Sequence, residues 1–242
     1  MKSIANMYVV QGRVFAPDVI PYRLIITPFG TNSLKQALGF SSATWNQESW
    51  DYVFQDGTLE RKSEVGTVPI TWVGFNDRRI VVQVFGDSDA AHAAYSAISE
   101  VLSELTPKFR SATPLAFNEE TSCVARLDFE WITLLNPALV DQVSRRVKEF
   151  STESIRRIVK GVSLRFTLGA MAVDERLNEY GIPLNDQQIV IEPRADVPLS
   201  ERTYFTYSPC DSDTHLQLVS ELEASLLKAR KRGARNGRTK RI

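Results

Sequence analysis

Histidine and cysteine are scarce in this chain of 242 residues, which has only two of each. A Ser-His-Asp or Cys-His catalytic arrangement would need His92 or His215, and neither lies in a recognisable motif. The chain also lacks cysteine and histidine groups with the spacing of a zinc site. Two cysteines, Cys123 and Cys210, make no disulfide framework in a chain this long, so we expect a reduced, cytoplasmic protein, with one pairing of the two left open.

Long apolar runs and nucleotide-binding motifs are also missing. The longest apolar stretches are strand-length and interrupted by charge, so none is expected to span a bilayer. The start, MKSIANMYVVQG, has no sustained apolar segment of the kind found in signal peptides. The sequence has no G-x-S-x-G, no Walker-type phosphate loop and no G-x-G-x-x-G. We therefore assign no catalytic residue, no metal ligand and no cofactor, and expect a protein that is not an enzyme.

Acidic residues are absent from the end of the chain. The protein has 29 basic and 29 acidic residues, but no acid follows Glu223. Eight basic residues lie beyond that point, so the rest of the chain has 21 basic and 29 acidic residues, a net charge of −8. Such a division between an acidic body and a basic tail indicates an anionic partner. The basic residues of the tail are Lys228, Arg230, Lys231, Arg232, Arg235, Arg238, Lys240 and Arg241.

Alternating apolar and polar residues predict an antiparallel sheet. In TSCVARLDFEW, the residues Cys123, Ala125, Leu127 and Phe129 share one face with Trp131. A period of two is typical of strands that are buried on one side only. VSLRFTLGA has the same period, and RRIVVQVF is apolar enough for a central strand. Further strands are expected in MYVVQGRVF, PYRLIITPF, SWDYVFQDG, VPITWVGF, QQIVIE and RTYFTYS, with a hairpin turn at FNDRR.

Three helices are expected in addition to a weak one at NSLKQALG. One begins at Asn136-Pro137, an N-cap followed by proline, and ends at Gly161. The others follow VFGDSDAAH and SPCDSDTH, and the second should end near Arg232–Gly233. The fold class is therefore α+β, with two pseudo-repeated halves that are each a mostly antiparallel sheet closed by an amphipathic helix. We place the halves at residues 1–118 and 119–232, followed by a disordered basic tail at 233–242.

The pseudo-repeat rests on two Asp-Ser-Asp stretches that lie 124 residues apart, at Asp87 and Asp211. At this spacing the apolar positions of both helices coincide, and Arg78 falls on Arg202 and Pro69 on Pro193. A duplication with an insertion competes with chance recurrence of a common strand-helix unit. His92 and His215 do not coincide, which disfavours a duplicated metal site. Aspartates before a helix accept hydrogen bonds from its first N–H groups, so we interpret these stretches as N-caps.

Carboxylates elsewhere leave a metal site open. Asp128 and Glu130 share one face of a strand and could hold a divalent cation, although we favour the solvated face of a half-buried strand as the explanation. Glu119 and Glu120 form another acidic pair, and Cys123 is expected in the core. Trp45 and Trp50 lie in a polar, loop-like stretch, SSATWNQESW, and are the aromatic residues to examine first for a binding surface.

A second basic feature is expected on the helix that begins at Asn136. Five basic residues fall within an arc of about 120° on a helical projection. Glu149 and Glu153 occupy the same arc, so a face of internally paired charges competes with an anion-binding face. The five basic residues are Arg145, Arg146, Arg156, Arg157 and Lys160.

These observations predict a non-enzymatic binding or assembly protein whose basic C-terminal tail engages nucleic acid or another polyanion. A protein partner is a further option, and no membrane partner is expected. One alternative is a metal-dependent hydrolase or nuclease that uses the clustered carboxylates. Another is a structural subunit of a larger assembly, into which the tail would insert.

Overall fold

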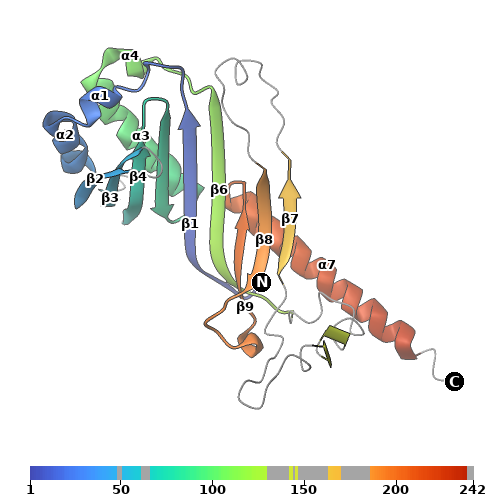
Figure 1. The fold of residues 1–242 in the computed structure, drawn as a ribbon. Helices are drawn as coiled ribbons and strands as arrows, with labels where there is room; N and C mark the ends of the chain where they lie inside the picture. Colours follow the sequence, from blue (N-terminus) through green and yellow to red (C-terminus); the bar gives the residue numbers. More distant parts are fainter. Residues whose placement is uncertain are drawn as a thin grey trace.

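The protein has a mixed α+β fold built on one large antiparallel sheet of nine strands (Figure 1). The computed structural model describes residues 1–47, 51–60, 66–129, 142–143, 145–146, 163–169 and 186–238. The strands lie in the order β2-β3-β4-β5-β1-β6-β9-β8-β7, and all neighbours are antiparallel. Their bounds are β1 Ser3–Val14, β2 Ser42–Asn46, β3 Asp51–Glu60, β4 Thr67–Phe75, β5 Arg79–Phe85, β6 Ala116–Arg126, β7 Leu164–Leu168, β8 Gln187–Pro193 and β9 Thr203–Ser208.

Two long helices cover one face of this sheet. α3 (Ser88–Leu105) packs on β5 and β1, and α7 (Ser212–Arg238) packs on β6 and β9. Each helix has its own apolar core against the sheet, around Val82 and Ile98 for α3 and around Cys123 and Val219 for α7. The shorter helices are α1 Tyr22–Ile25, α2 Pro28–Leu38, α4 Pro107–Arg110 and the 3-10 turn η2 Leu199–Glu201. No helix in the described ranges is long and apolar enough to cross a bilayer.

The period-two pattern identified most strands correctly. Cys123, Ala125, Leu127 and Phe129 are all buried, as their shared face predicts. RRIVVQVF forms β5, between β4 and β1 in the interior of the sheet. FNDRR forms the hairpin turn, where the Asn76 side chain accepts hydrogen bonds from the backbone N–H groups of residues 78 and 79. Trp131 lies outside the described residues.

Two local predictions were wrong. PYRLIITPF was expected to be a strand, but it forms α1 and the start of α2. Thr27 caps α2 by accepting a hydrogen bond from Gly30 N–H, and Pro28 occupies the first turn, where its missing N–H has no cost. SSATWNQESW was expected to be a loop, but Ser42–Asn46 pairs with β3 as the edge strand β2. The weak helix NSLKQALG is part of α2, which ends at Gly39 in the left-handed conformation.

The sheet is continuous between the N-terminal and C-terminal parts of the chain. β1 pairs with β6, and the expected boundary between residues 118 and 119 falls inside β6. The first residues of α3 and α7 also contact each other. Ser88 N–H donates to Ser212 Oγ at 3.1 Å, and Ser212 N–H donates to Ser88 Oγ at 2.8 Å. These two serines are equivalent in the 124-residue alignment.

Helix α7 continues to Arg238, past the end expected at Arg232–Gly233. This part of α7 contains Gly233 and Gly237. Each glycine in a helix costs only about 1 kcal/mol, and the alanine and arginine residues beside them favour a helix. The disorder expected for residues 233–242 of the free protein stays a prediction. The predicted helix from Asn136 falls mostly outside the described residues, although residues 142, 143, 145 and 146 are helical.

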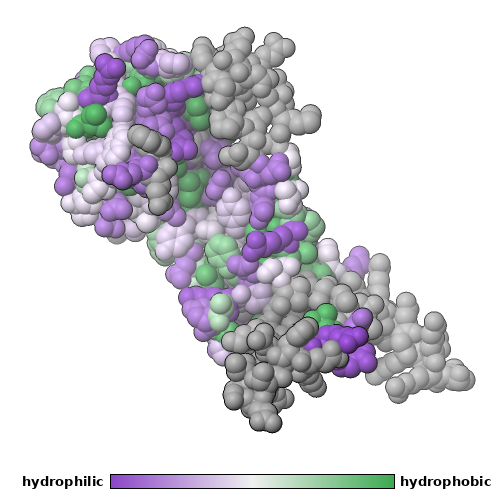
Figure 2. Space-filling model, in the orientation of Figure 1, coloured by the Kyte–Doolittle hydropathy of each residue, from purple (hydrophilic) through white to green (hydrophobic). Residues whose placement is uncertain are grey.

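The face of the sheet opposite α3 and α7 presents a row of aromatic residues. In the strand register Phe85 lies beside Tyr8, Tyr8 beside Ser122, and Ser122 beside Tyr207. The rings of Tyr8 and Phe85 meet edge to face, with centroids 5.1 Å apart. Figure 2 shows small hydrophobic areas separated by hydrophilic ones on the side of the molecule in view. This face therefore combines aromatic and polar groups.

Candidate functional site

The two Asp-Ser-Asp stretches are helix N-caps, as predicted. Asp87 Oδ1 accepts a hydrogen bond from Ala90 N–H at 2.8 Å. Asp211 accepts from Thr214 N–H at 2.9 Å and from the Thr214 hydroxyl at 2.7 Å, and these bonds lower the pKa of its carboxyl group. Within the described ranges, no three His, Cys, Asp or Glu side chains come together as a metal-binding group. The repeated acidic motif therefore starts two helices.

We expect the loss of either cap to weaken folding moderately. Asp87→Ala or Asp211→Ala should lower the free energy of unfolding by roughly 0.5–2 kcal/mol, because the first-turn N–H groups lose their acceptor. Asp89→Ala is the control, since this exposed aspartate is not the cap. Urea denaturation measures the differences. A saturable rise in Tm with Mg²⁺ or Mn²⁺ that either cap variant abolishes would contradict capping as the sole role.

The two histidines have unrelated environments, as their lack of sequence equivalence suggests. His92 is exposed, and its Nδ1 lies 2.7 Å from the Ser88 carbonyl oxygen. His215 is only 1% exposed, with Nδ1 2.6 Å from Ser208 Oγ and Nε2 2.9 Å from Thr206 Oγ1. Burial lowers the pKa of His215 to about 4, so the ring is neutral at physiological pH.

His215 is surrounded by Cys123, Thr206 and Ser208, residue types that also occur in catalytic sites, but the burial and pKa of these groups do not suit catalysis. The Cys123 thiol lies 3.5 Å from His215 Nε2 and 3.1 Å from Thr206 Oγ1. Burial raises the pKa of the Cys123 thiol, whereas a nucleophilic cysteine needs a lowered pKa and access to substrate. Ser208 is fully buried. We therefore interpret this cluster as an internal polar network between β6, β9 and α7.

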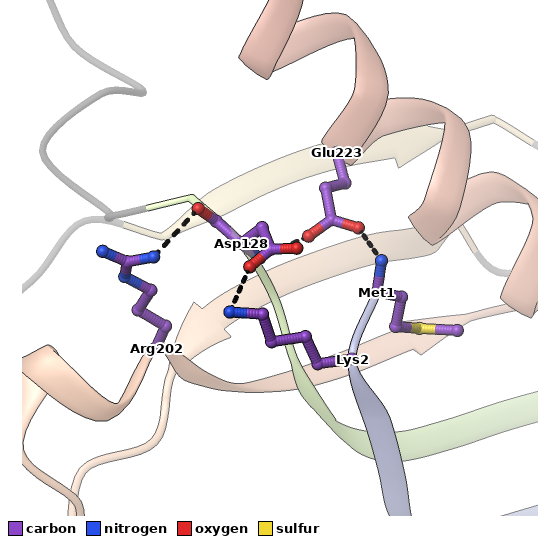
Figure 3. Close-up of polar contacts among 5 residues, drawn as sticks. All are labelled: Met1, Lys2, Asp128, Arg202 and Glu223. Carbon is purple, nitrogen blue, oxygen red and sulfur yellow. Dashed lines mark hydrogen bonds and ion pairs between the residues drawn. The ribbon is translucent and has the colours of Figure 1, made fainter.

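Asp128 belongs to an ion-pair network at the end of β6 (Figure 3). Its carboxylate pairs with Lys2 Nζ at 2.6 Å, and this hydrogen bond lowers the pKa of Asp128. The buried Glu223 of α7 accepts hydrogen bonds from the Met1 amino group and from Asp128 N–H, and Arg202 donates to the Asp128 carbonyl at 3.2 Å. The network joins β1, β6 and α7. Glu130, the other proposed cation ligand, lies outside the described residues.

Most predicted polyanion-binding residues are described by their backbone alone or not at all. Lys228 is exposed on α7, and the helix backbone continues through Arg230, Lys231, Arg232, Arg235 and Arg238. Arg145 and Arg146 are exposed and helical. Lys240, Arg241, Arg156, Arg157 and Lys160 lie outside the described residues. Of the two tryptophans singled out from the sequence, Trp45 is 44% exposed on β2, and Trp50 is outside the described ranges.

A cavity between β6, β8 and the start of α7 was not predicted. It has a volume of about 280 Å³. Glu119 lines it although this carboxylate is only 8% exposed. The sequence did contain a signal for the burial of Glu119, because the alternation that buries Cys123 in β6 continues upstream through Thr121 to Glu119. The lining residues are Phe117, Asn118, Glu119, Gln187, Pro209, Cys210 and Asp211.

Comparison of the sequence with protein-family models and with curated proteins finds no match. The functional argument therefore rests on the residues, contacts and charges of this chain.

Proposed function

We propose that the chain is a non-enzymatic binding or assembly protein whose basic C-terminal tail engages nucleic acid or another polyanion. The observation that supports this most directly is the division of charge, +8 after Glu223 and −8 for residues 1–223. The proposal includes a cytoplasmic protein with Cys123 and Cys210 as free thiols. It involves no membrane.

The position of the basic residues on α7 supports the proposal. Among the α7 side chains that the structure describes, which end at Lys228, the last to pack against the apolar core is Leu227, and Lys228 is exposed. From there the helix continues for 11 residues to Arg238, about 16 Å at the usual rise per residue (Figure 1). The negative end of the helix dipole favours cationic side chains in this part of the helix. A basic arm that leaves an acidic body suits an extended polyanion.

The acidic body restricts where a polyanion would bind. The −8 charge of residues 1–223 repels phosphates, so we assign contact to the tail and to the Arg145–Lys160 segment. No base-reading motif is present in the sequence, and binding should therefore be largely independent of nucleotide sequence, with Kd on the order of micromolar.

We also propose that the fold consists of two pseudo-repeated halves, each closed by one helix. The strand order supports this. From β1 outward the sheet continues with β5, β4 and β3, and from β6 outward in the other direction it continues with β9, β8 and β7. The reciprocal hydrogen bonds of Ser88 and Ser212 are those that a local two-fold axis would produce between equivalent residues. A duplicated scaffold would present the single basic arm from one half only.

The two alternative functions receive different support. A metal-dependent hydrolase needs converging carboxylates, but Asp87 and Asp211 are N-caps and Asp128 pairs with Lys2. A structural subunit is favoured by the aromatic row on the sheet face opposite the helices, where Phe85 and Phe205 are 41% and 37% exposed. A protein partner on this face is compatible with a tail that binds a polyanion.

Charge-neutral variants test the proposal. Replacement of the eight basic tail residues by glutamine should abolish binding of a 20-nucleotide RNA and of duplex DNA at low salt, because the tail then has no positive charge to pair with phosphates. The control replaces Lys35, Lys108 and Arg110 by glutamine and should alter Kd by less than about twofold. Lys108 and Arg110 are exposed on α4, and Lys35 is half-buried on α2. Fluorescence anisotropy gives Kd. Equal binding by the tail variant and the unmodified protein would refute the proposal.

A further inference from the structure

The cavity beside Glu119 exists because β9 is shorter than its neighbours. β6 pairs with β1 from its first residue, Ala116, but pairs with β9 only from Thr121 onward. β9 ends at Ser208, where the chain turns through Pro209 and Cys210 to α7. The Thr121 hydroxyl donates to the Cys210 carbonyl at 2.8 Å and fixes this turn. A notch is therefore left in the sheet between the start of β6 and Gln187 of β8.

Glu119 is an under-bonded carboxylate in this notch. Its Oε2 accepts one hydrogen bond, from Gln11 Nε2 at 3.1 Å on the neighbouring strand. Its Oε1 is buried and has no hydrogen-bond partner among the described residues. A buried carboxylate oxygen without a hydrogen-bond donor is destabilising, so the site would gain from a ligand that supplies N–H groups.

The other groups of the cavity favour a cation. Asp211 adds a second carboxylate, and its hydrogen bonds to Thr214 keep it ionised. Burial raises the pKa of the Cys210 thiol, and the negative charges of Asp211 and Glu119 raise it further, so the thiol is neutral at neutral pH and the negative charge of the cavity comes from the carboxylates. Phe117 also lines the cavity and is 51% exposed, so part of its side chain is open to a ligand. Its ring already has one cationic neighbour, the Arg13 guanidinium at 5.4 Å, and a ligand would approach the exposed part of the ring.

We propose that this cavity binds an ammonium or guanidinium group, with Glu119 as its anionic partner. Guanidinium is the better match, because its planar N–H donors can reach a carboxylate while its face stacks on an aromatic ring. The volume of about 280 Å³ suits a single side chain or a small amine. This chemistry could come from a free amine or from an arginine or lysine side chain of a peptide. The site is distinct from the basic tail and does not depend on it.

Two probes separate these sources in the full-length chain. Agmatine represents the free guanidine, and the capped tripeptide Gly-Arg-Gly represents a side chain, with Gly-Gln-Gly as the uncharged control. Isothermal titration calorimetry should give saturable binding of at least one guanidinium probe and none of the control. Glu119→Gln should weaken that binding by at least about tenfold, because a charged hydrogen-bonded pair is lost. Asp213→Asn, at an exposed carboxylate outside the cavity, should change it by less than about twofold.

The probe that binds identifies the source, and either result supports the site when it depends on Glu119. Phe117→Ala is the second variant, since this exposed side chain is not required for the core, and we expect about a two- to fivefold loss of affinity. Absence of saturable binding by both guanidinium probes would overturn the proposal, as would equal affinity in Glu119→Gln and the unmodified protein. Neither outcome bears on polyanion binding by the tail, which the glutamine variant of the tail tests separately.

Discussion

The free energy of unfolding should fall by about 3 kcal/mol between pH 6.5 and pH 4 through His215 alone. Burial lowers the pKa of His215 from 6.5 to about 4 in the folded protein. In the unfolded chain the same ring takes up a proton near pH 6.5. Below that pH the unfolded state binds more protons than the folded state, so stability decreases as the pH falls through this window. From about pH 7.5 upward the ring is neutral in both states and its contribution is constant.

Two variants isolate this effect from the titration of carboxylates. His215→Gln should show a smaller loss of stability between pH 6.5 and 4 than the unmodified protein, by about 3 kcal/mol, because glutamine does not titrate. His92→Gln makes the same replacement at the exposed histidine and serves as the comparison variant. Urea denaturation at several pH values provides the profiles. NMR titration of the imidazole protons checks the cause directly, and a His215 resonance that titrates near pH 6.5 in the folded protein would contradict it.

Binding of duplex DNA by the full chain should weaken roughly 500-fold when salt is raised from 50 to 200 mM. If about five of the eight basic tail residues neutralise phosphates, the slope of log affinity against log salt is about −4.5. We count five phosphate contacts and not eight because the basic residues are spread along α7 and the sequence that follows it. The Glu119 cavity contributes nothing to this slope, since a carboxylate site repels phosphate.

The sequence pattern predicted the sheet well because one face of nearly every strand is buried. The alternation from Cys123 to Phe129 is the direct consequence of packing against α7 and the residues around it. The prediction of a strand for PYRLIITPF was wrong because its β-branched residues favour a strand, whereas Pro21 and the cap formed by Thr27 favour the starts of helices. The edge strand β2 was missed because an edge strand with exposed residues has little apolar periodicity.

Register and contacts between distant segments could not be read from the sequence. The alignment of Pro69 with Pro193 fails in the structure, because residues 76–78 connect β4 to β5 while residues 194–202 connect β8 to β9. The alignment is consistent only from Arg78 and Arg202 onward, which includes Ser88 and Ser212. The caps were predictable from local chemistry alone. The Glu119 cavity was not, because it depends on where β9 ends relative to β6 and β8.

Removal of the tail tests the central claim most directly. The full chain and a chain truncated after Leu227, which packs on the core, should be compared in salt titrations of RNA and DNA binding. The account predicts a slope near −4 to −5 for the full chain on duplex DNA and loss of measurable binding after truncation. Circular dichroism and urea denaturation confirm that the truncated chain is folded. Identical binding by the two proteins, or no binding by the full chain at low salt, would contradict the polyanion-binding function and favour a protein partner.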